Sequence, residues 1–171
     1  MSKKPRQAPA APTVVRNEVA ARYRSGQEAK VRRALAPLGT LDTYPAQRMV
    51  VLTRAPGITS TAAAAALDEL RRLKLVEFVT PVLRDPDTKT RQVLTDEIVV
   101  RMKPGRTKRT LAALGASHGI AIARQNEFEP SQYIVTVAEP SGTQTLDVAR
   151  SLDSSDEVEF ASPNFLTEIK R

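Results

Sequence analysis

The residue types that most often carry catalysis are nearly absent from this chain. It has 171 residues, no cysteine and one histidine, His118, which excludes disulfides, thiolate chemistry and multi-histidine metal sites. His118 comes just before Gly119, at the expected end of a helix, and no nucleophile–base pair is evident near it. We therefore expect a surface or capping histidine and no metal site.

Two carboxylates stand close together in an expected hairpin loop, Glu127 and Glu129. The first N–H groups of a helix have no partner within the helix, and its dipole favours negative charge at that end. Carboxylates in a loop are also the commonest solvated charges, so the residues alone give the pair no role.

Basic charge is concentrated in the first half of the chain. The whole sequence carries a formal charge of +7, and residues 1–90 hold 16 lysines and arginines against 8 acidic residues, whereas residues 91–171 hold 10 against 11. A basic half can attract nucleic acid, an anionic surface or an acidic protein. Arginines that merely solvate exposed helix faces would give the same count.

The composition is that of a protein with a packed core. Hydrophobic residues make up 41% of the chain and aromatic residues 4%, so the core is expected to consist of Val, Leu, Ile and Ala. No apolar run approaches the roughly 18 residues of a membrane span, and no apolar stretch follows the basic start. We expect a cytoplasmic protein that does not contact membranes.

An internal repeat is the most informative feature of the sequence. EVAARYRSG at 18–26 matches EIVVRMKPG at 97–105, which lies 79 residues later, and VEFVTP at 76–81 matches VEFASP at 158–163. Two further matches lie between them in the same order: the glycines Gly39 and Gly119, and the segments 47–57 and 131–142. We infer a duplication.

Each repeat is expected to run strand, helix, strand, strand, helix, strand. In the second copy, Ile98, Val100 and Met102 alternate with residues of the other face, and Leu111 and Leu114 have helical spacing. The predicted class is α+β, with two tandem ferredoxin-like βαββαβ sandwiches, each an antiparallel sheet with two helices on one face. The predicted organisation is a disordered basic tail (1–16), a diverged first unit (17–82), a polar linker (83–96), a second unit (97–166) and a C-terminal tail (167–171).

Such a sandwich leaves one face of each sheet without helices, and an uncovered face is a candidate docking surface. Strict alternation points Val158 and Phe160 toward the helices, together with Tyr133. The residues expected on the open face of the second unit are Val99, Arg101, Ile134, Thr136, Glu159 and Ala161.

The second unit resembles the prodomains of subtilisin-like serine proteases, the propeptide-type peptidase inhibitors. The resemblance covers residues 97 to about 166 and rests on EIVVRMKPG, on the strand at 132–137, and on VEFASPNF near the end. The first unit departs further from the pattern, because Ser25 replaces the turn proline and VTPVL replaces ASPNF.

The resemblance implies a protein that is not an enzyme and takes no cofactor. It implies an inhibitor or folding chaperone of a subtilisin-like protease, forming a heterodimer with it. Prodomains of this family pack the open sheet face on two surface helices of the protease, with acidic hairpin residues at the helix ends. They also lay the C-terminal tail in the substrate cleft, where an extended peptide can add to a strand edge. The tail residues here are Pro163, Asn164, Phe165, Leu166, Thr167, Glu168, Ile169, Lys170 and Arg171, and Glu127 and Glu129 match the capping carboxylates.

Two other classes of function stay open. RNA-recognition domains share the sandwich, but they need aromatic side chains on the open face of the central strands. The matching strands hold one aromatic residue, Tyr133, expected to face the helices, so we regard nucleic-acid binding as the alternative. A small-molecule regulatory domain or small enzyme has no glycine-rich phosphate loop or carboxylate pair to support it. Phe165 and Leu166 could instead fold back on their own sheet.

Overall fold

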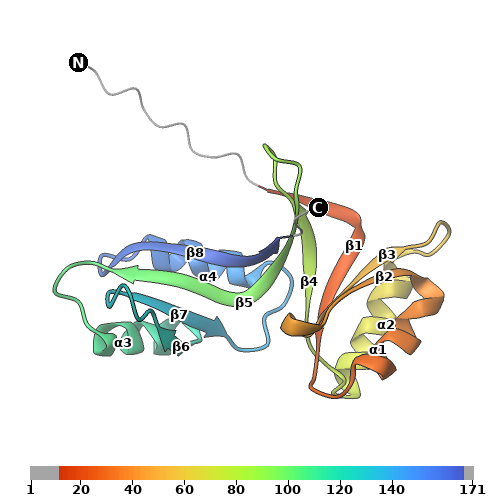
Figure 1. Ribbon diagram of the computed structural model, residues 1–171, viewed down its shortest axis with the longest axis horizontal. Helices are drawn as coiled ribbons and strands as arrows, with labels where there is room; N and C mark the ends of the chain where they lie inside the picture. Colours follow the sequence, from red (N-terminus) through yellow and green to blue (C-terminus); the bar gives the residue numbers. More distant parts are fainter. Residues whose placement is uncertain (1–11, 168–171) are drawn as a thin grey trace.

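The computed structural model describes residues 12–167, which form a mixed α+β fold with an eight-stranded antiparallel sheet and four α-helices (Figure 1). The tails expected at 1–16 and 167–171 lie mostly outside the described residues. Where they are described, they belong to strands, because the first strand begins at Thr13 and the last ends at Thr167. No helix within the described part is long and apolar enough to cross a membrane.

The first half of the chain forms four strands in the order β2-β3-β1-β4 with two helices on one side. Short 3-10 turns at Ala36–Leu38 and Pro45–Gln47 border the second strand. The elements are β1 (Thr13–Tyr23), α1 (Glu28–Leu35), β2 (Gly39–Tyr44), β3 (Met49–Arg54), α2 (Ser60–Arg72) and β4 (Val76–Arg84).

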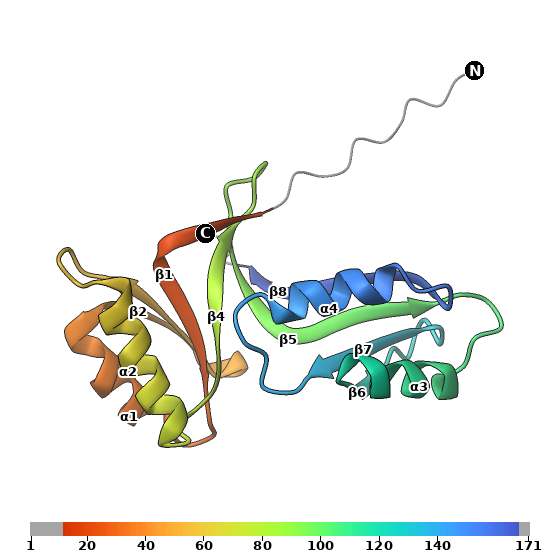
Figure 2. The same cartoon turned by 180° about the vertical axis from the view of Figure 1, so that it is seen from behind.

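The second half repeats this arrangement, with the strand order β6-β7-β5-β8. In both halves the first strand lies between the third and the fourth, and the second strand is an edge. Figure 2 shows α3 and α4 on the same side of the second-half strands. The elements are β5 (Arg91–Met102), α3 (Lys108–His118), β6 (Ile120–Gln125), β7 (Gln132–Val137), α4 (Gln144–Asp153) and β8 (Val158–Thr167).

Each half has its own apolar core between helices and sheet. In the second half, Leu111 of α3 and Leu152 of α4 are fully buried against the β5 residues Ile98 and Val100, as the helical and strand periodicities require. Gly119 ends α3 in the left-handed conformation, with φ of 65°, and its N–H donates to the Gly115 carbonyl. Its predicted role as a helix C-cap is confirmed.

The strand pairing of the two halves has the same register. Ala20 pairs with Val51 in the first half, and Val99 pairs with Ile134 in the second. The same correspondence holds between the first and last strands of each half: Arg22 pairs with Phe78, and 79 residues later Arg101 pairs with Phe160. Both ladders then shift at the next residue, where Tyr23 pairs with Val76 and Met102 with Val158.

The segment 83–96, expected to be a polar linker, is instead an ordered hairpin of two strand ends. Val82, Leu83 and Arg84 of β4 pair with Val93, Gln92 and Arg91 of β5. At its turn, Asp85 accepts hydrogen bonds from the N–H groups of Asp87 and Thr88, which lowers the pKa of its carboxyl group. The two halves are therefore joined through one continuous sheet.

Candidate docking surface

The uncovered face of the second-half sheet lies opposite α3 and α4 and faces the viewer in Figure 1. Four of the six residues expected there are on it. Val99 and Arg101 of β5 share this face, and Ile134 and Thr136 of β7 pair with Val99 and Glu97. All four are half-buried by their neighbours on the sheet. This face thus carries two adjacent aliphatic side chains next to a guanidinium group.

The other two expected residues are not on this face, because a β-bulge interrupts the alternation of β8. The ladder passes from Met102–Val158 to Arg101–Phe160, so Glu159 is the extra residue of the bulge and is exposed. Beyond the bulge, Ala161 packs with the second-half core. Phe160 lies on the uncovered face instead. The strict alternation assumed for this strand is wrong.

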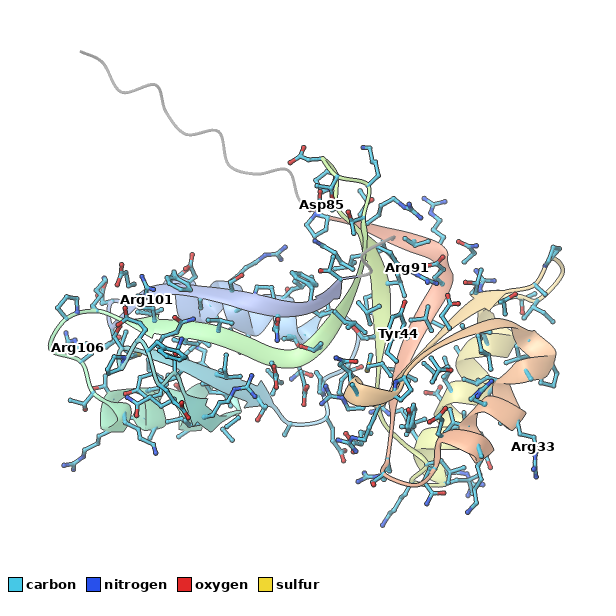
Figure 3. The ribbon with its side chains drawn as sticks, viewed as in Figure 1. Arg33, Tyr44, Asp85, Arg91, Arg101 and Arg106 are labelled. Carbon is cyan, nitrogen blue, oxygen red and sulfur yellow. The ribbon has the colours of Figure 1, made fainter. Side chains whose placement is uncertain are left out.

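Arg101 and Phe160 form a cation–π contact on this face. The Arg101 guanidinium carbon lies 5.0 Å from the centre of the Phe160 ring. Within residues 12–167, Arg101 has no ion pair, and its Nε is buried without a hydrogen-bond partner. Figure 3 places Arg101 near the end of β5 that is farther from the first half. A cation that stacks on a ring without a carboxylate partner can still bind an incoming anion.

The β6–β7 hairpin at the edge of this face presents an exposed aromatic residue, Phe128, which is 95% exposed. Asn126 holds the loop in place, because its Oδ1 accepts from the Phe128 N–H and its Nδ2 donates to Gln132. Gln125 Nε2 also donates to the Pro130 carbonyl. A cavity of about 300 Å³ beside the loop is lined by Phe128 and Ile134, among others, and so connects the hairpin to the sheet face. Phe128 is therefore presented in a fixed loop with almost no covering.

The two hairpin carboxylates differ in their partners. Glu129 accepts a hydrogen bond of 2.6 Å from Ser131 Oγ, and hydrogen bonds from the Ser131 side chain and backbone lower the pKa of its carboxyl group, with the charge of Arg101 adding to the effect. Glu127 is exposed and makes no hydrogen bond or ion pair with another described residue. Of the two expected capping carboxylates, Glu127 is the one left open to a partner.

The described part of the expected cleft-binding tail belongs to β8. Pro163, Phe165 and Leu166 pair with Ile98, Leu94 and Val93. Asn164 adds side-chain and main-chain contacts: Thr95 Oγ1 donates to its carbonyl, and its Nδ2 donates to Glu97. Phe165 and Leu166 thus fold back on the sheet of their own chain, which was the open alternative. Glu168, Ile169, Lys170 and Arg171 lie outside the described residues.

The equivalent face of the first half is covered by the junction between the halves. Ala20, Val51 and Phe78 of this face form an apolar cluster with Val93 of β5, and Leu166 of β8 packs against it. Phe78 carries its own cation–π contact, with the Arg22 guanidinium 5.0 Å from the ring centre. Here the arginine also has an anionic partner. Arg22 Nη1 lies 2.6 Å from Asp96 Oδ1, and both side chains are mostly buried.

Arg91 forms ion pairs at the edge of the same junction (Figure 3). Its Nε donates to Glu18 at 2.8 Å and its Nη1 to Asp42 at 2.6 Å, with Arg91 and Glu18 largely buried. Burial would lower the pKa of the Arg91 guanidinium, but the hydrogen bonds and charges of Asp42 and Glu18 outweigh it and raise that pKa. A cation contributed by β5 thus neutralises two carboxylates on the first-half sheet.

His118 joins the two helices of the second half. Its Nδ1 lies 3.0 Å from the Leu114 carbonyl, so this nitrogen donates, and its Nε2 lies 3.0 Å from Ser151 Oγ on α4. The sequence did not indicate this serine–histidine contact. Among residues 12–167 no carboxylate is hydrogen-bonded to the ring, and both side chains lie at helix surfaces, so the contact connects α3 to α4.

No group of three or more potential metal ligands occurs among residues 12–167. In comparisons with known proteins, no family model matches the chain and no curated protein matches it.

Proposed function

We propose that the chain is an inhibitor, folding chaperone or both of a subtilisin-like serine protease and docks through the second-half sheet face. The observation that carries this proposal is the uncovered surface that runs from Val99, Arg101 and Phe160 across Ile134 to Phe128. An apolar sheet face that continues into an exposed aromatic residue in a fixed loop is typical of a protein-binding surface. The resemblance of this half to protease prodomains supplies the kind of partner.

We also infer that the two halves are duplicated ferredoxin-like units. The shared strand order, the matched register and the same bulge after the arginine–phenylalanine pair support this inference. The first unit no longer offers its sheet face to a partner, because β5 and β8 of its own chain cover it. Its role in this proposal is to support the second unit.

The tail takes a narrower part in this proposal than the resemblance implied. Residues 163–167 belong to β8, which pairs with β5, and residues 81–84, which are equivalent to 163–166, also lie in a strand. A peptide cannot pair with β5 and with a protease cleft through the same backbone groups. Entry into the cleft therefore falls to residues after Thr167, or requires the end of β8 to leave β5.

Nucleic-acid binding has less support from the geometry. Tyr133 is buried in the second-half core, so the central strands β5 and β7 present Val99 and Ile134 where a base-stacking surface needs aromatic rings. Phe160 is on the uncovered face, but it belongs to an edge strand and is already stacked with Arg101.

The proposal is tested by titrating a panel of subtilisin-like proteases with the purified chain and following peptide hydrolysis. We expect tight inhibition of at least one of them and its loss in Ile134→Asp, which places a carboxylate in the middle of the docking face. Arg109→Glu, on α3 and therefore on the helix side, is the matched control and should inhibit like the wild type.

A truncation separates the role of the face from that of the tail. A chain ending at Thr167 keeps all of β8 and should still bind the protease, but with weaker blockage of the active site. Absence of inhibition across the panel, together with gel-shift binding to RNA that falls steeply with salt, would replace the proposal by the nucleic-acid alternative.

A further inference from the structure

The covered face of the first half shows which groups bind an arginine–phenylalanine pair of this kind when the face is buried. Arg22 stacks on Phe78, and the cover supplies Asp96 as an ion-pair partner of that arginine and Val93 as an aliphatic neighbour in the apolar cluster. The carboxylate and the aliphatic side chain come from one strand, β5, three residues apart. Both are held against the face in a largely water-excluded junction, because the side chains of Arg22 and Asp96 are 14% and 17% exposed.

The second half carries the same surface at matched register positions. Glu18 corresponds to Glu97, Ala20 to Val99 and Arg22 to Arg101 on the first strand of each half; on the other strands, Val51 corresponds to Ile134, Thr53 to Thr136 and Phe78 to Phe160. The distance from the arginine to the ring centre is 5.0 Å in both halves. What differs is the cover. Arg101 makes no ion pair among residues 12–167, whereas Arg22 is paired with Asp96; the Nε of both arginines is buried without a hydrogen bond.

We infer that the partner of the second-half face presents a carboxylate to Arg101 beside an aliphatic side chain seated near Phe160, as Asp96 and Val93 do for Arg22 and Phe78. This inference rests on the proposed function and specifies the protease surface that fits it. An aspartate or glutamate on the protease, a few residues from a Val, Leu or Ile along one element, is the contact that this face accepts. The charge of such a contact contributes to specificity, because a protease with lysine there would bury two like charges.

The acidic residues of the face already have hydrogen-bond partners within the chain, so they do not need a cation from the protease. In the first half, Glu18 is paired with Arg91, but in the second half its counterpart Glu97 already accepts a hydrogen bond of 2.8 Å from Asn164 Nδ2. Glu129 is bound to Ser131. Glu97 lacks the ion pair of its counterpart but is hydrogen-bonded, whereas Arg101 makes neither an ion pair nor a hydrogen bond with another residue in 12–167.

The test uses the protease that the full-length wild-type chain inhibits most tightly, and it measures the inhibition constant for three variants. We expect Arg101→Glu to raise the inhibition constant by about 30-fold or more, since removing one member of a desolvated pair and adding a like charge both weaken binding. Arg101→Gln should raise it by about tenfold. Arg109→Glu changes the net charge equally on the helix side, and we expect less than a threefold change.

The thermal unfolding midpoint of each variant shows whether the fold is intact. Arg101→Gln keeps a long polar side chain, so it decides the question if Arg101→Glu unfolds. Inhibition by the wild type that Arg101→Glu leaves within threefold, or strengthens, overturns the inference and leaves the proposed function standing. If the wild-type chain inhibits no subtilisin-like protease, the proposed function fails and the inference fails with it.

Discussion

Two arginine–phenylalanine pairs occupy equivalent positions in the two halves of this protein but have different surroundings. Arg22 and Phe78 lie under the junction, with an ion pair to Asp96 and an apolar cover from β5 and β8. Arg101 and Phe160 have the same stacking distance, and within the described part of the chain they have no such cover. One sheet face is part of the interior of the molecule, whereas the equivalent face of the second half presents the same arginine–phenylalanine pair at the surface.

In the proposed function, this difference gives the two halves separate tasks. Two exposed aliphatic residues beside an arginine stacked on a ring are typical of a protein-binding surface. The covered face stabilises the molecule, and the uncovered face is the one that can still bind. We therefore place recognition in the second half and support in the first.

The sharpest stability test of this comparison replaces each phenylalanine by alanine. Phe78 is 2% exposed, so Phe78→Ala should leave a cavity and lower the free energy of unfolding by about 3–4 kcal/mol. Phe160→Ala removes a partly exposed ring and should cost about 1 kcal/mol or less. Urea unfolding followed by circular dichroism measures both values. Equal losses would mean that the two faces are equally buried.

The second test compares an arginine of the junction, Arg91, with the arginine of the open face, Arg101. Arg91→Met leaves Glu18 and Asp42 without their cation in the junction, and we expect a loss of about 2–3 kcal/mol in the free energy of unfolding. Arg101→Met should change it by less than about 0.5 kcal/mol, since Arg101 has no ion pair with another described residue. A junction that tolerates Arg91→Met as well as the open face tolerates Arg101→Met would not be held by these ions.

Phe128 extends the comparison from stability to protease binding. Phe128→Ser should leave the free energy of unfolding within about 0.5 kcal/mol, because the ring has almost no contacts to lose. It should weaken protease inhibition by about tenfold, as expected for an aromatic residue presented in a fixed loop. Leu73→Ser is the matched control, since Leu73 is 50% exposed at the end of α2 in the first half. Similar inhibition constants for both variants would remove the hairpin from the docking surface.

The smallest expected effect concerns the protonation of Glu129. Hydrogen bonds from Ser131 hold the pKa of the Glu129 carboxyl group below its ordinary value of 4.5. The bonds therefore stabilise the hairpin above that pH, and their contribution is lost as the pH falls through the lowered pKa. A carbon-detected NMR titration should show this lowered pKa, and Ser131→Ala should move it back toward 4.5. An unchanged pKa in Ser131→Ala would assign the shift to another group.

Much of the fold follows from patterns that the sequence contains. The repeat, the strand alternation of β5 and the helical spacing of Leu111 predicted the succession of strands and helices, and the position of Gly119 predicted the end of α3. The same patterns placed Tyr133 toward the helices and Val99, Arg101, Ile134 and Thr136 on the opposite face. These predictions succeeded because side-chain direction in a regular element depends on local periodicity.

The remaining features depend on contacts that periodicity does not encode. The sequence predicts the wrong face for Phe160 because a bulge at Glu159 adds one residue to the strand. Both halves have the sequence VEF at this place and the same bulge, so comparing the two halves does not reveal it. The end of β8 matches the end of β4, since Asn164 and Phe165 follow Pro163 as Val82 and Leu83 follow Pro81, and both segments lie in strands. Which of two similar faces is covered depends on how the halves pack, and the sequence of one unit does not contain that information.

Hydroxyl-radical footprinting with mass spectrometry tests the central claim most directly, because it measures the exposure of individual side chains. The full chain would be labelled alone and with a subtilisin-like protease whose catalytic serine is replaced by alanine. The account predicts that Phe160, Ile134 and Phe128 are oxidised in the free chain and protected in the complex, with Phe78 protected in both and Leu73 oxidised in both. Oxidation of Phe160 and Ile134 that the protease leaves unchanged, or strong oxidation of Phe78 in the free chain, would contradict it.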